Sequence, residues 1–170
     1  MTVRFAPFLL DPSVPPEGKP RRQHTQPGDP PSALELRGES LGIKFARGRE
    51  RTSYSLTALE AGEFATEHGD ALRFHRELFK AYFTDLVDIS DSDLLVEAAM
   101  NSGLDGGALA DALATGKYRQ QVIDGINWSR GVGVTAIPTF VFEEQHGIVG
   151  AQDYSVFQSM MKDLGQEPKA

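Results

Sequence analysis

The segment Gly131–Phe140, with the sequence GVGVTAIPTF, carries the most structural information in this 170-residue chain. Pro138 stands directly before a β-rich run, Thr139–Phe142, and follows a glycine-containing loop. Spacing alone favours a trans proline that opens a strand, because only about 5–6% of X–Pro bonds in folded proteins are cis. A cis bond at this position would instead make a sharp turn and expose the backbone of Ile137 to a ligand.

The residues after this segment predict a β-hairpin and a final helix. A turn at residues 144–147 separates Thr139–Phe142 from a second short run at residues 147–149. Asp153 is placed to cap the helix that follows. The inward face of this helix is expected to hold Phe157, Met160, Met161 and Leu164.

The middle of the chain is expected to be helical. Hydroxyl and acidic residues stand at helix starts, and glycines stand at helix ends. One helix has a wide apolar face, because Phe74, Leu78 and Tyr82 recur at four-residue spacing. The helices are expected from Ser53 or Ser55 to His68, from Asp70, from Ser90 to Gly103, from Asp105 through Leu113, and from about Lys117 to Arg130.

The N-terminal part alternates apolar and other residues over Val3–Leu10, which predicts a β-strand. Pro7 cannot donate to a ladder, so it should lie at an edge or a bulge. Residues 12–31 hold seven of the ten prolines, which predicts an extended, irregular loop. A short helix is expected over Ser32–Arg37.

The composition limits the classes of partner. The net charge of −7 argues against non-specific binding to nucleic acids or anionic membranes. No apolar run approaches the ~20 residues that span a bilayer, and the first residues lack the pattern of a signal peptide, so a cytoplasmic location is expected. The chain has no cysteine, which excludes disulfides, zinc–thiolate sites and iron–sulfur clusters.

Taken together, these features resemble the DsbA-like thioredoxin domain family. The segment Gly131–Phe140, the hairpin and Gly150-Ala151-Gln152 resemble the C-terminal half of that domain. Phe8–Pro12 followed by Pro15–Gly18 resembles the FrnE-like branch, which is related to hydroxychromene-carboxylate isomerases and kappa-class glutathione transferases.

The resemblance implies an α/β, thioredoxin-like fold of the DsbA type with an inserted all-helical domain. Residues 1–45 and 117–170 would form the thioredoxin-like part, and residues 46–116 the helical insertion. It also implies a cis proline and a substrate-binding site for a peptide or thiol, with no cofactor. The site would consist of Ala136, Ile137 and Pro138.

The chain departs from the family at its beginning. The family starts with a strand and a helix that carries Cys-x-x-Cys, and no counterpart of either is found, so no catalytic residue is expected here. In the family fold the missing strand lies between the second strand and the hairpin. Three arrangements remain open: Val3–Leu10 pairs directly with Thr139–Phe142, two chains pair or exchange strands as a homodimer, or the sequence is a fragment of a longer protein.

Three functions also remain open. The family activity is that of a protein thiol–disulfide oxidoreductase or disulfide isomerase, for which this chain would be redox-inactive. The second is a non-catalytic peptide-binding module. The third is a glutathione-dependent isomerase-like or transferase-like protein.

Other polar and aromatic residues are expected to have structural roles. The histidines are too dispersed to predict a metal site, which needs three or four convergent ligands. The basic run Lys44–Arg51 is expected to be a solvated connection, with an anion site as the alternative. Trp128 and Tyr154 are expected in the core, with a pocket lining as the alternative.

Overall fold

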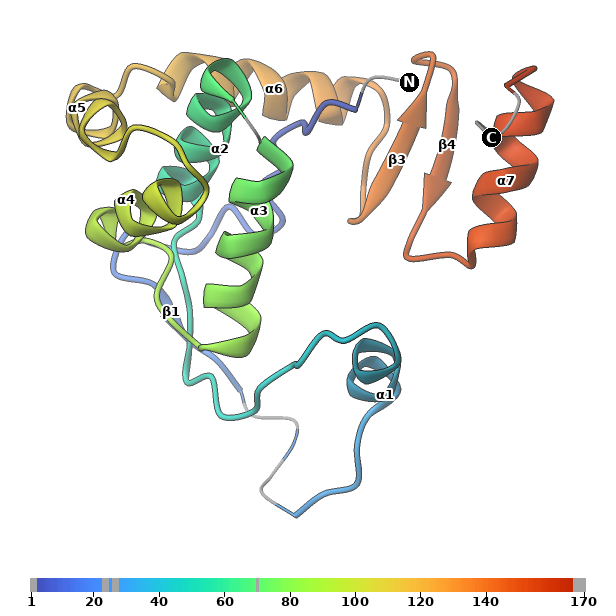
Figure 1. The fold of residues 1–170 in the computed structure, drawn as a ribbon, viewed down its shortest axis with the longest axis horizontal. Helices are drawn as coiled ribbons and strands as arrows, with labels where there is room; N and C mark the ends of the chain where they lie inside the picture. Colours follow the sequence, from blue (N-terminus) through green and yellow to red (C-terminus); the bar gives the residue numbers. More distant parts are fainter. Residues whose placement is uncertain (1–2, 23–24, 26–27, 70, 167–170) are drawn as a thin grey trace.

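The chain forms three parts, which Figure 1 shows for the computed structural model of residues 3–22, 25, 28–69 and 71–166. A helical block contains α2 to α5, an arm carries α1, and a hairpin unit contains β3, β4 and α7; α6 leads from the block to the hairpin unit. The elements are β1 (Lys19–Pro20), α1 (Ala33–Ser40), β2 (Arg51–Thr52), α2 (Leu56–His68), α3 (Ala71–Phe79), the π-helical turn η1 (Lys80–Thr84), α4 (Ser92–Asn101), α5 (Gly106–Thr115), α6 (Arg119–Gly131), β3 (Thr139–Phe142), β4 (His146–Val149) and α7 (Tyr154–Asp163).

The helical block holds the main hydrophobic core. Phe64, Phe74, Leu95 and Leu109 are at most 1% exposed, and buried alanines between them let the helices pack closely. Tyr118, just before α6, completes this cluster, so the start of α6 is fixed to the block. The helices expected in this region are confirmed.

The predicted cap at Asp105 is confirmed at atomic detail, whereas the helix expected from Ser90 is capped one residue later, by Asp91. The Asp91 carboxylate accepts a hydrogen bond from the Asp93 N–H, and the Asp105 carboxylate accepts one from the Ala108 N–H. These carboxylates satisfy amides that have no partner within the helix. The expected start at Asp70 lies outside the described residues.

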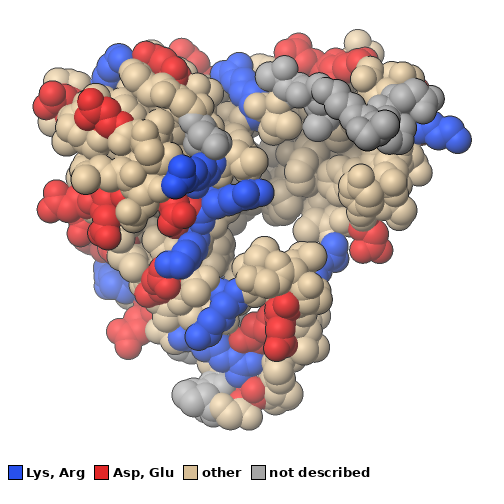
Figure 2. Space-filling view, in the orientation of Figure 1, with Lys and Arg blue, Asp and Glu red and all other residues tan. Residues whose placement is uncertain are grey.

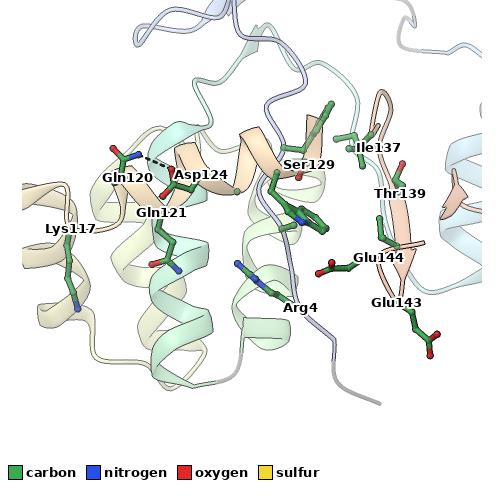
Figure 3. A pocket seen from close by; sticks show the side chains of 16 residues that line it. Arg4, Lys117, Gln120, Gln121, Asp124, Ser129, Ile137, Thr139, Glu143 and Glu144 are labelled. Carbon is green, nitrogen blue, oxygen red and sulfur yellow. Dashed lines mark hydrogen bonds between the residues drawn. The ribbon is translucent and has the colours of Figure 1, made fainter. Parts of the chain in front are cut away.

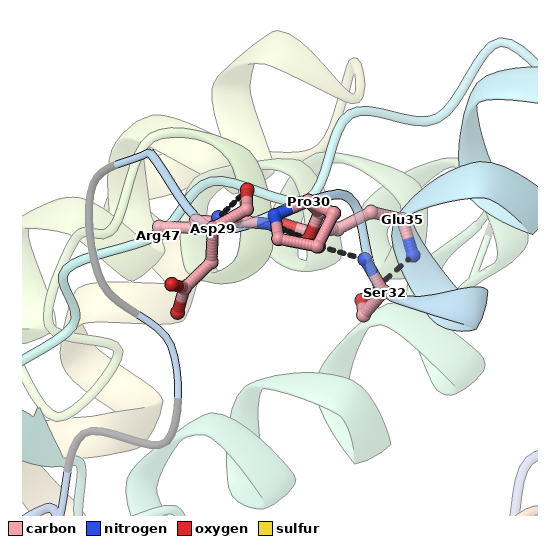
Figure 4. Close-up of polar contacts among 5 residues, drawn as sticks. All are labelled: Asp29, Pro30, Ser32, Glu35 and Arg47. Carbon is pink, nitrogen blue, oxygen red and sulfur yellow. Dashed lines mark hydrogen bonds and ion pairs between the residues drawn. The ribbon is translucent and has the colours of Figure 1, made fainter.

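The arm leaves the helical block at a short antiparallel ladder between β1 and β2, which the sequence did not predict. Its helix α1 starts with a reciprocal capping box between Ser32 and Glu35. Arg47 donates to the Glu35 carboxylate and to the carbonyls of Asp29 and Pro30, as Figure 4 shows. One guanidinium therefore joins the segment after α1 to the loop before α1 and to the first turn of α1.

The hairpin unit is thinly packed. β3 and β4 pair antiparallel, from Thr139 opposite Val149 to Phe142 opposite His146. Helix α7 lies beside the hairpin, with the rings of Phe140 and Phe157 4.8 Å apart and perpendicular. The face of α7 expected to point inward is only half-buried.

The expected strand Val3–Leu10 is wrong as a secondary-structure assignment. The segment is extended, but it joins no ladder among the described residues. Direct pairing with Thr139–Phe142 is also contradicted, because β4 is the only described strand that pairs with β3. A ladder needs a neighbouring strand about 4.7–4.9 Å away, and among the described residues no strand but β4 pairs with β3.

The surface is unevenly charged. Figure 2 shows the three parts meeting around a hollow in the middle of this face, with Lys and Arg side chains gathered along one of its borders. Acidic side chains lie mostly on the outer surface of the same view. In the described part of the chain, no helix has both the length and the hydropathy needed to cross a bilayer.

Candidate functional site: an open cleft beside the cis proline

A cleft of about 900 Å³ separates the N-terminal segment from β3. Helix α6 forms its floor, because residues three, four and seven apart on α6 face the same side. Arg4, Ala6 and Phe8 line one wall, and residues of β3 and its flanking loops line the other. The floor is formed by Lys117, Gln120, Gln121, Asp124, Gly125, Trp128 and Ser129.

Contacts with α6 and with His75 hold the N-terminal wall of the cleft in place. Pro7 is buried against Gly125 of α6, and its carbonyl accepts a hydrogen bond of 3.0 Å from the Ser129 hydroxyl. The Phe5 ring lies 4.2 Å from the His75 ring, centroid to centroid. Burial lowers the pKa of His75, so this imidazole favours its neutral form.

The side chains of this extended segment alternate in direction, so those that do not pack on α6 or His75 point toward the cleft. Residues two apart in an extended chain share a face, so Arg4 and Ala6 point away from the packed Phe5 and Pro7. Both are exposed. No backbone N–H of Val3–Leu10 donates a hydrogen bond to a described residue. The wall is therefore an extended chain with free donors.

The wall formed by β3 also has a free edge. The Gly150 N–H donates to the Pro138 carbonyl over 2.7 Å, so Pro138 and Gly150 form a hydrogen-bonded pair. Antiparallel pairs alternate, so the backbone groups of Thr139 and Val141 point away from β4. Figure 1 places β4 on the side of β3 away from the N-terminal segment. The free edge of β3 therefore faces the cleft.

The predicted substrate-binding residues lie at the mouth of this cleft. The Ile137–Pro138 peptide bond is cis. The Ile137 side chain is 49% exposed and lines the cleft, whereas Ala136 and Pro138 are exposed beside it. The Thr139 hydroxyl donates to the Ala136 carbonyl over 2.6 Å, which fixes the bend of the loop.

Two opposite charges face the space between the walls. Figure 3 shows Glu144 pointing from the end of the hairpin strand into the cleft, while Arg4 enters from the other wall and Glu143 points away. Neither Arg4 nor Glu144 forms an ion pair with another described residue. On the floor, Asp124 accepts a hydrogen bond of 2.9 Å from Gln120.

Comparison with known proteins identifies the family of this chain. The family model of the DSBA-like thioredoxin domain matches residues 1–162. The chain belongs to the DSBA-like thioredoxin domain family.

One relative and one solved structure of similar fold extend the comparison. The chain is 27% identical over 163 residues to the uncharacterized protein YwbO of Bacillus subtilis (strain 168), covering 95% of this chain and 81% of YwbO. It is also similar in fold to a probable DsbA oxidoreductase from Streptomyces coelicolor, with a TM-score of 0.69 and 22% identity. That match covers 81% of this chain, and the chain spans 60% of that solved structure.

The family fold fits the predicted α/β thioredoxin-like architecture, but this member has no cysteine with which to perform thiol chemistry. The prediction of Ile137 as a substrate-binding residue rested on the resemblance to the family. The floor of α6 and the residues Arg4 and Glu144 were missed, since they reach the cleft only through tertiary packing.

The expectations for the aromatic residues are wrong. Trp128 is partly exposed on the cleft floor, and Tyr154 is 75% exposed and lines a second, shallow pocket beside Phe157, so both fit the alternative of a pocket lining. Both occupy the incompletely covered hairpin side of the molecule, where too few elements pack to bury them.

The basic run is bound to the chain itself. Arg49 lies 3.7 Å above the Tyr82 ring, and Arg51 donates to the Glu17 and Gly18 carbonyls. His68 and His75 lie on different helices, and no group of metal-binding side chains forms among the described residues.

Proposed function

We propose that this chain binds extended polypeptide segments at the cleft and performs no thiol–disulfide exchange with its own residues. One observation carries the proposal: an exposed Ile137 and the free edge of β3 meet at the open mouth of the cleft. Free backbone donors and acceptors beside apolar side chains suit a peptide that adds as a strand. Thiol–disulfide exchange, the activity that the name of the structurally similar DsbA oxidoreductase implies, needs cysteine thiolates, which this chain does not contain.

Peptide binding and insulin reduction test the proposal on the purified chain. A fluorescein-labelled unfolded peptide should bind, with its polarization rising to saturation. Ile137→Asp should weaken this binding at least about tenfold, because it places a charge against the apolar part of the peptide. Ile123→Asp is the matched control, since Ile123 is also partly exposed but does not line the cleft.

The other functions give different results in the same assays. Insulin reduction above the buffer rate would contradict a redox-inactive module. Saturable glutathione binding, with no peptide binding, would support the glutathione-dependent alternative and overturn the proposal. Absence of both kinds of binding would also overturn it.

A further inference from the structure

We infer that the contact between His75 and Phe5 is an acid-sensitive switch in the N-terminal wall of the cleft: the neutral imidazole holds Phe5, and the imidazolium releases it. The inference goes beyond the proposed function, because it concerns the wall itself and not the molecule that the cleft binds. It depends on the side chain of Phe5, so it is independent of what pairs with the backbone of the N-terminal segment.

The imidazole of His75 packs against aromatic rings and helix backbone. The Phe5 ring lies 4.2 Å from it, and the Phe74 and Phe79 rings each lie 6.0 Å from it, centroid to centroid. On the side of α2, a Cβ atom added to Gly62 would lie 3.2 Å from Cε1 of His75 and 3.6 Å from Nε2. None of these groups can accept a hydrogen bond from a ring N–H in the way that water does.

One nitrogen of this imidazole has no hydrogen-bond partner. The Nε2 atom of His75 is buried, and no described residue bonds to it. A neutral imidazole can leave this nitrogen as a bare lone pair, whereas an imidazolium carries an N–H on both nitrogens. Protonation in place would therefore create a buried, charged donor without an acceptor. Burial lowers the pKa of His75 for the same reason.

Nearby charges do not offset this effect. Burial alone accounts for the lowered pKa of His75. Glu63 on α2 accepts a hydrogen bond from Gln121 of α6, and Arg73 on α3 donates to the Asn101 carbonyl. The charged residues closest along the three elements that surround the imidazole are Arg4, Glu60, Glu63, Arg73, Arg76 and Glu77.

The contact with Phe5 should open before the rest of the structure does. Phe74, next to His75 on α3, is fully buried in the core of the helical block, whereas Phe5 is only partly buried. Pro7 has its own contact with α6 and its own hydrogen bond from Ser129, and neither involves the imidazole. Acid should therefore release the segment before Pro7, which includes part of the cleft wall, and leave the block intact.

The direction of the pH dependence follows from the lowered pKa. The contact lowers the pKa of His75 below its ordinary value of 6.5, so the contact is fully present above pH 6.5. It is lost as the pH falls through the lowered pKa. Between these two values, the equilibrium constant for the contact should fall up to about tenfold for each pH unit.

NMR of the ring signals tests the switch on the purified chain, titrated from about pH 8 to about pH 4. The imidazole of His75 should titrate below pH 6.5, and the nuclear Overhauser effects between Phe5 and His75 should disappear with the same midpoint. The Phe74 signals should stay native. Overhauser effects that persist after His75 is protonated would overturn the inference, as would loss of the Phe74 signals at the same midpoint. A pKa of His75 at or above 6.5 would show that the rings stabilise the imidazolium, and would also overturn it.

Three variants assign the effect to His75. His75→Phe supplies a ring that cannot be protonated, so the Phe5 signals should stay constant down to about pH 4. His146→Gln removes an exposed imidazole of the hairpin and should leave the Phe5 transition unchanged. Phe5→Ala should raise the pKa of His75 toward 6.5, because it uncovers the imidazole.

The results of these variants can contradict the inference without peptide binding being measured. An acid transition at Phe5 that survives in His75→Phe would overturn it, and so would an unchanged pKa of His75 in Phe5→Ala. A chain that binds no peptide but shows the transition would overturn the proposed function alone.

Discussion

The helical block and the hairpin unit differ in how completely they bury their apolar side chains. Phe64, Phe74 and Leu95 are almost fully buried in the block, whereas Ile148 is the one buried residue in the described hairpin unit. Helices with several helical neighbours can cover their apolar faces within a short stretch of chain. A two-stranded sheet with one helix cannot, because an isolated hairpin is marginally stable and needs further strands or helices.

Replacement of a phenylalanine by alanine should therefore reduce the free energy of unfolding far more in the helical block than in the hairpin unit. Phe74→Ala removes a fully buried ring from the block and should reduce the free energy of unfolding by about 3–5 kcal/mol. Phe157→Ala removes a half-buried ring that contacts Phe140 and should cost about 1 kcal/mol. Urea denaturation followed by circular dichroism measures both. Equal losses would contradict the difference between the two regions.

The sequence was informative where structure is local. Asp105 caps α5 by accepting a hydrogen bond from the Ala108 amide three residues away, so its role was predictable. The start of α4 was predicted to within one residue, since its cap is Asp91 and not Ser90. The ladder between β1 and β2 joins residues that are far apart in the chain, and no local pattern announces it. The alternation in Val3–Leu10 correctly predicted an extended chain, but a ladder also needs a neighbour, which residue spacing cannot supply.

The residues of the candidate site also fall into two groups: those that the sequence predicted and those that only tertiary packing brings together. Ile137 was predicted as a site residue from the family resemblance that its loop carries, and its side chain lines the cleft. Arg4, Gln121 and Glu144 come from three separate segments, and only the packing of α6 brings them to one space. The half-exposed Trp128 shows why burial was misjudged: an apolar residue on a helix is buried only if another element covers it.

The junction between α6 and the helical block depends on a buried charge. Glu60 is almost fully buried on α2 and accepts a hydrogen bond from Arg119 of α6, while its Oε2 atom has no hydrogen-bond partner among the described residues. Arg119→Met should reduce the free energy of unfolding by about 2–3 kcal/mol, because it leaves this carboxylate without its cation. Thermal and urea unfolding measure the loss.

Two further variants separate charge from packing at this junction. Adding Glu60→Gln to Arg119→Met should recover part of the loss, because the buried group is then neutral. Arg76→Met, which changes an exposed arginine on α3, should stay within about 0.5 kcal/mol of the parent chain. A loss from Arg119→Met no larger than this would show that α6 is anchored by apolar packing alone.

The N-terminal wall of the cleft should be displaced by one methyl group. A Cβ atom at Gly125 would lie 2.6 Å from Cγ of Pro7, so Gly125→Ala must push the extended segment away from α6. Alanine favours the helix by about 1 kcal/mol, but overpacking costs about 1–3 kcal/mol, so a net loss of about 1 kcal/mol is expected. Amide exchange over residues 3–10 should accelerate.

Gly131→Ala provides the matched control on the same helix. A Cβ atom there would meet nothing within 4 Å, so this variant should leave exchange over residues 3–10 unchanged. If both variants behave alike, Pro7 is not held by its contact with Gly125, and the N-terminal wall of the cleft is set by other contacts.

The smallest expected effect is a change in the pKa of Glu35 in the arm. The arm is held together by ion pairs more than by buried apolar side chains. Hydrogen bonds from Arg47 and then Ser32 lower the pKa of Glu35 from 4.5 to about 2. The stabilisation from this carboxylate is therefore present above its ordinary pKa and is lost as the pH falls toward 2. Arg47→Met should raise the pKa of Glu35 partway toward 4.5, since Ser32 remains; NMR titration measures it. Lys44→Met should leave it unchanged, and an unaltered pKa in Arg47→Met would show that the capping box alone holds this end of the arm.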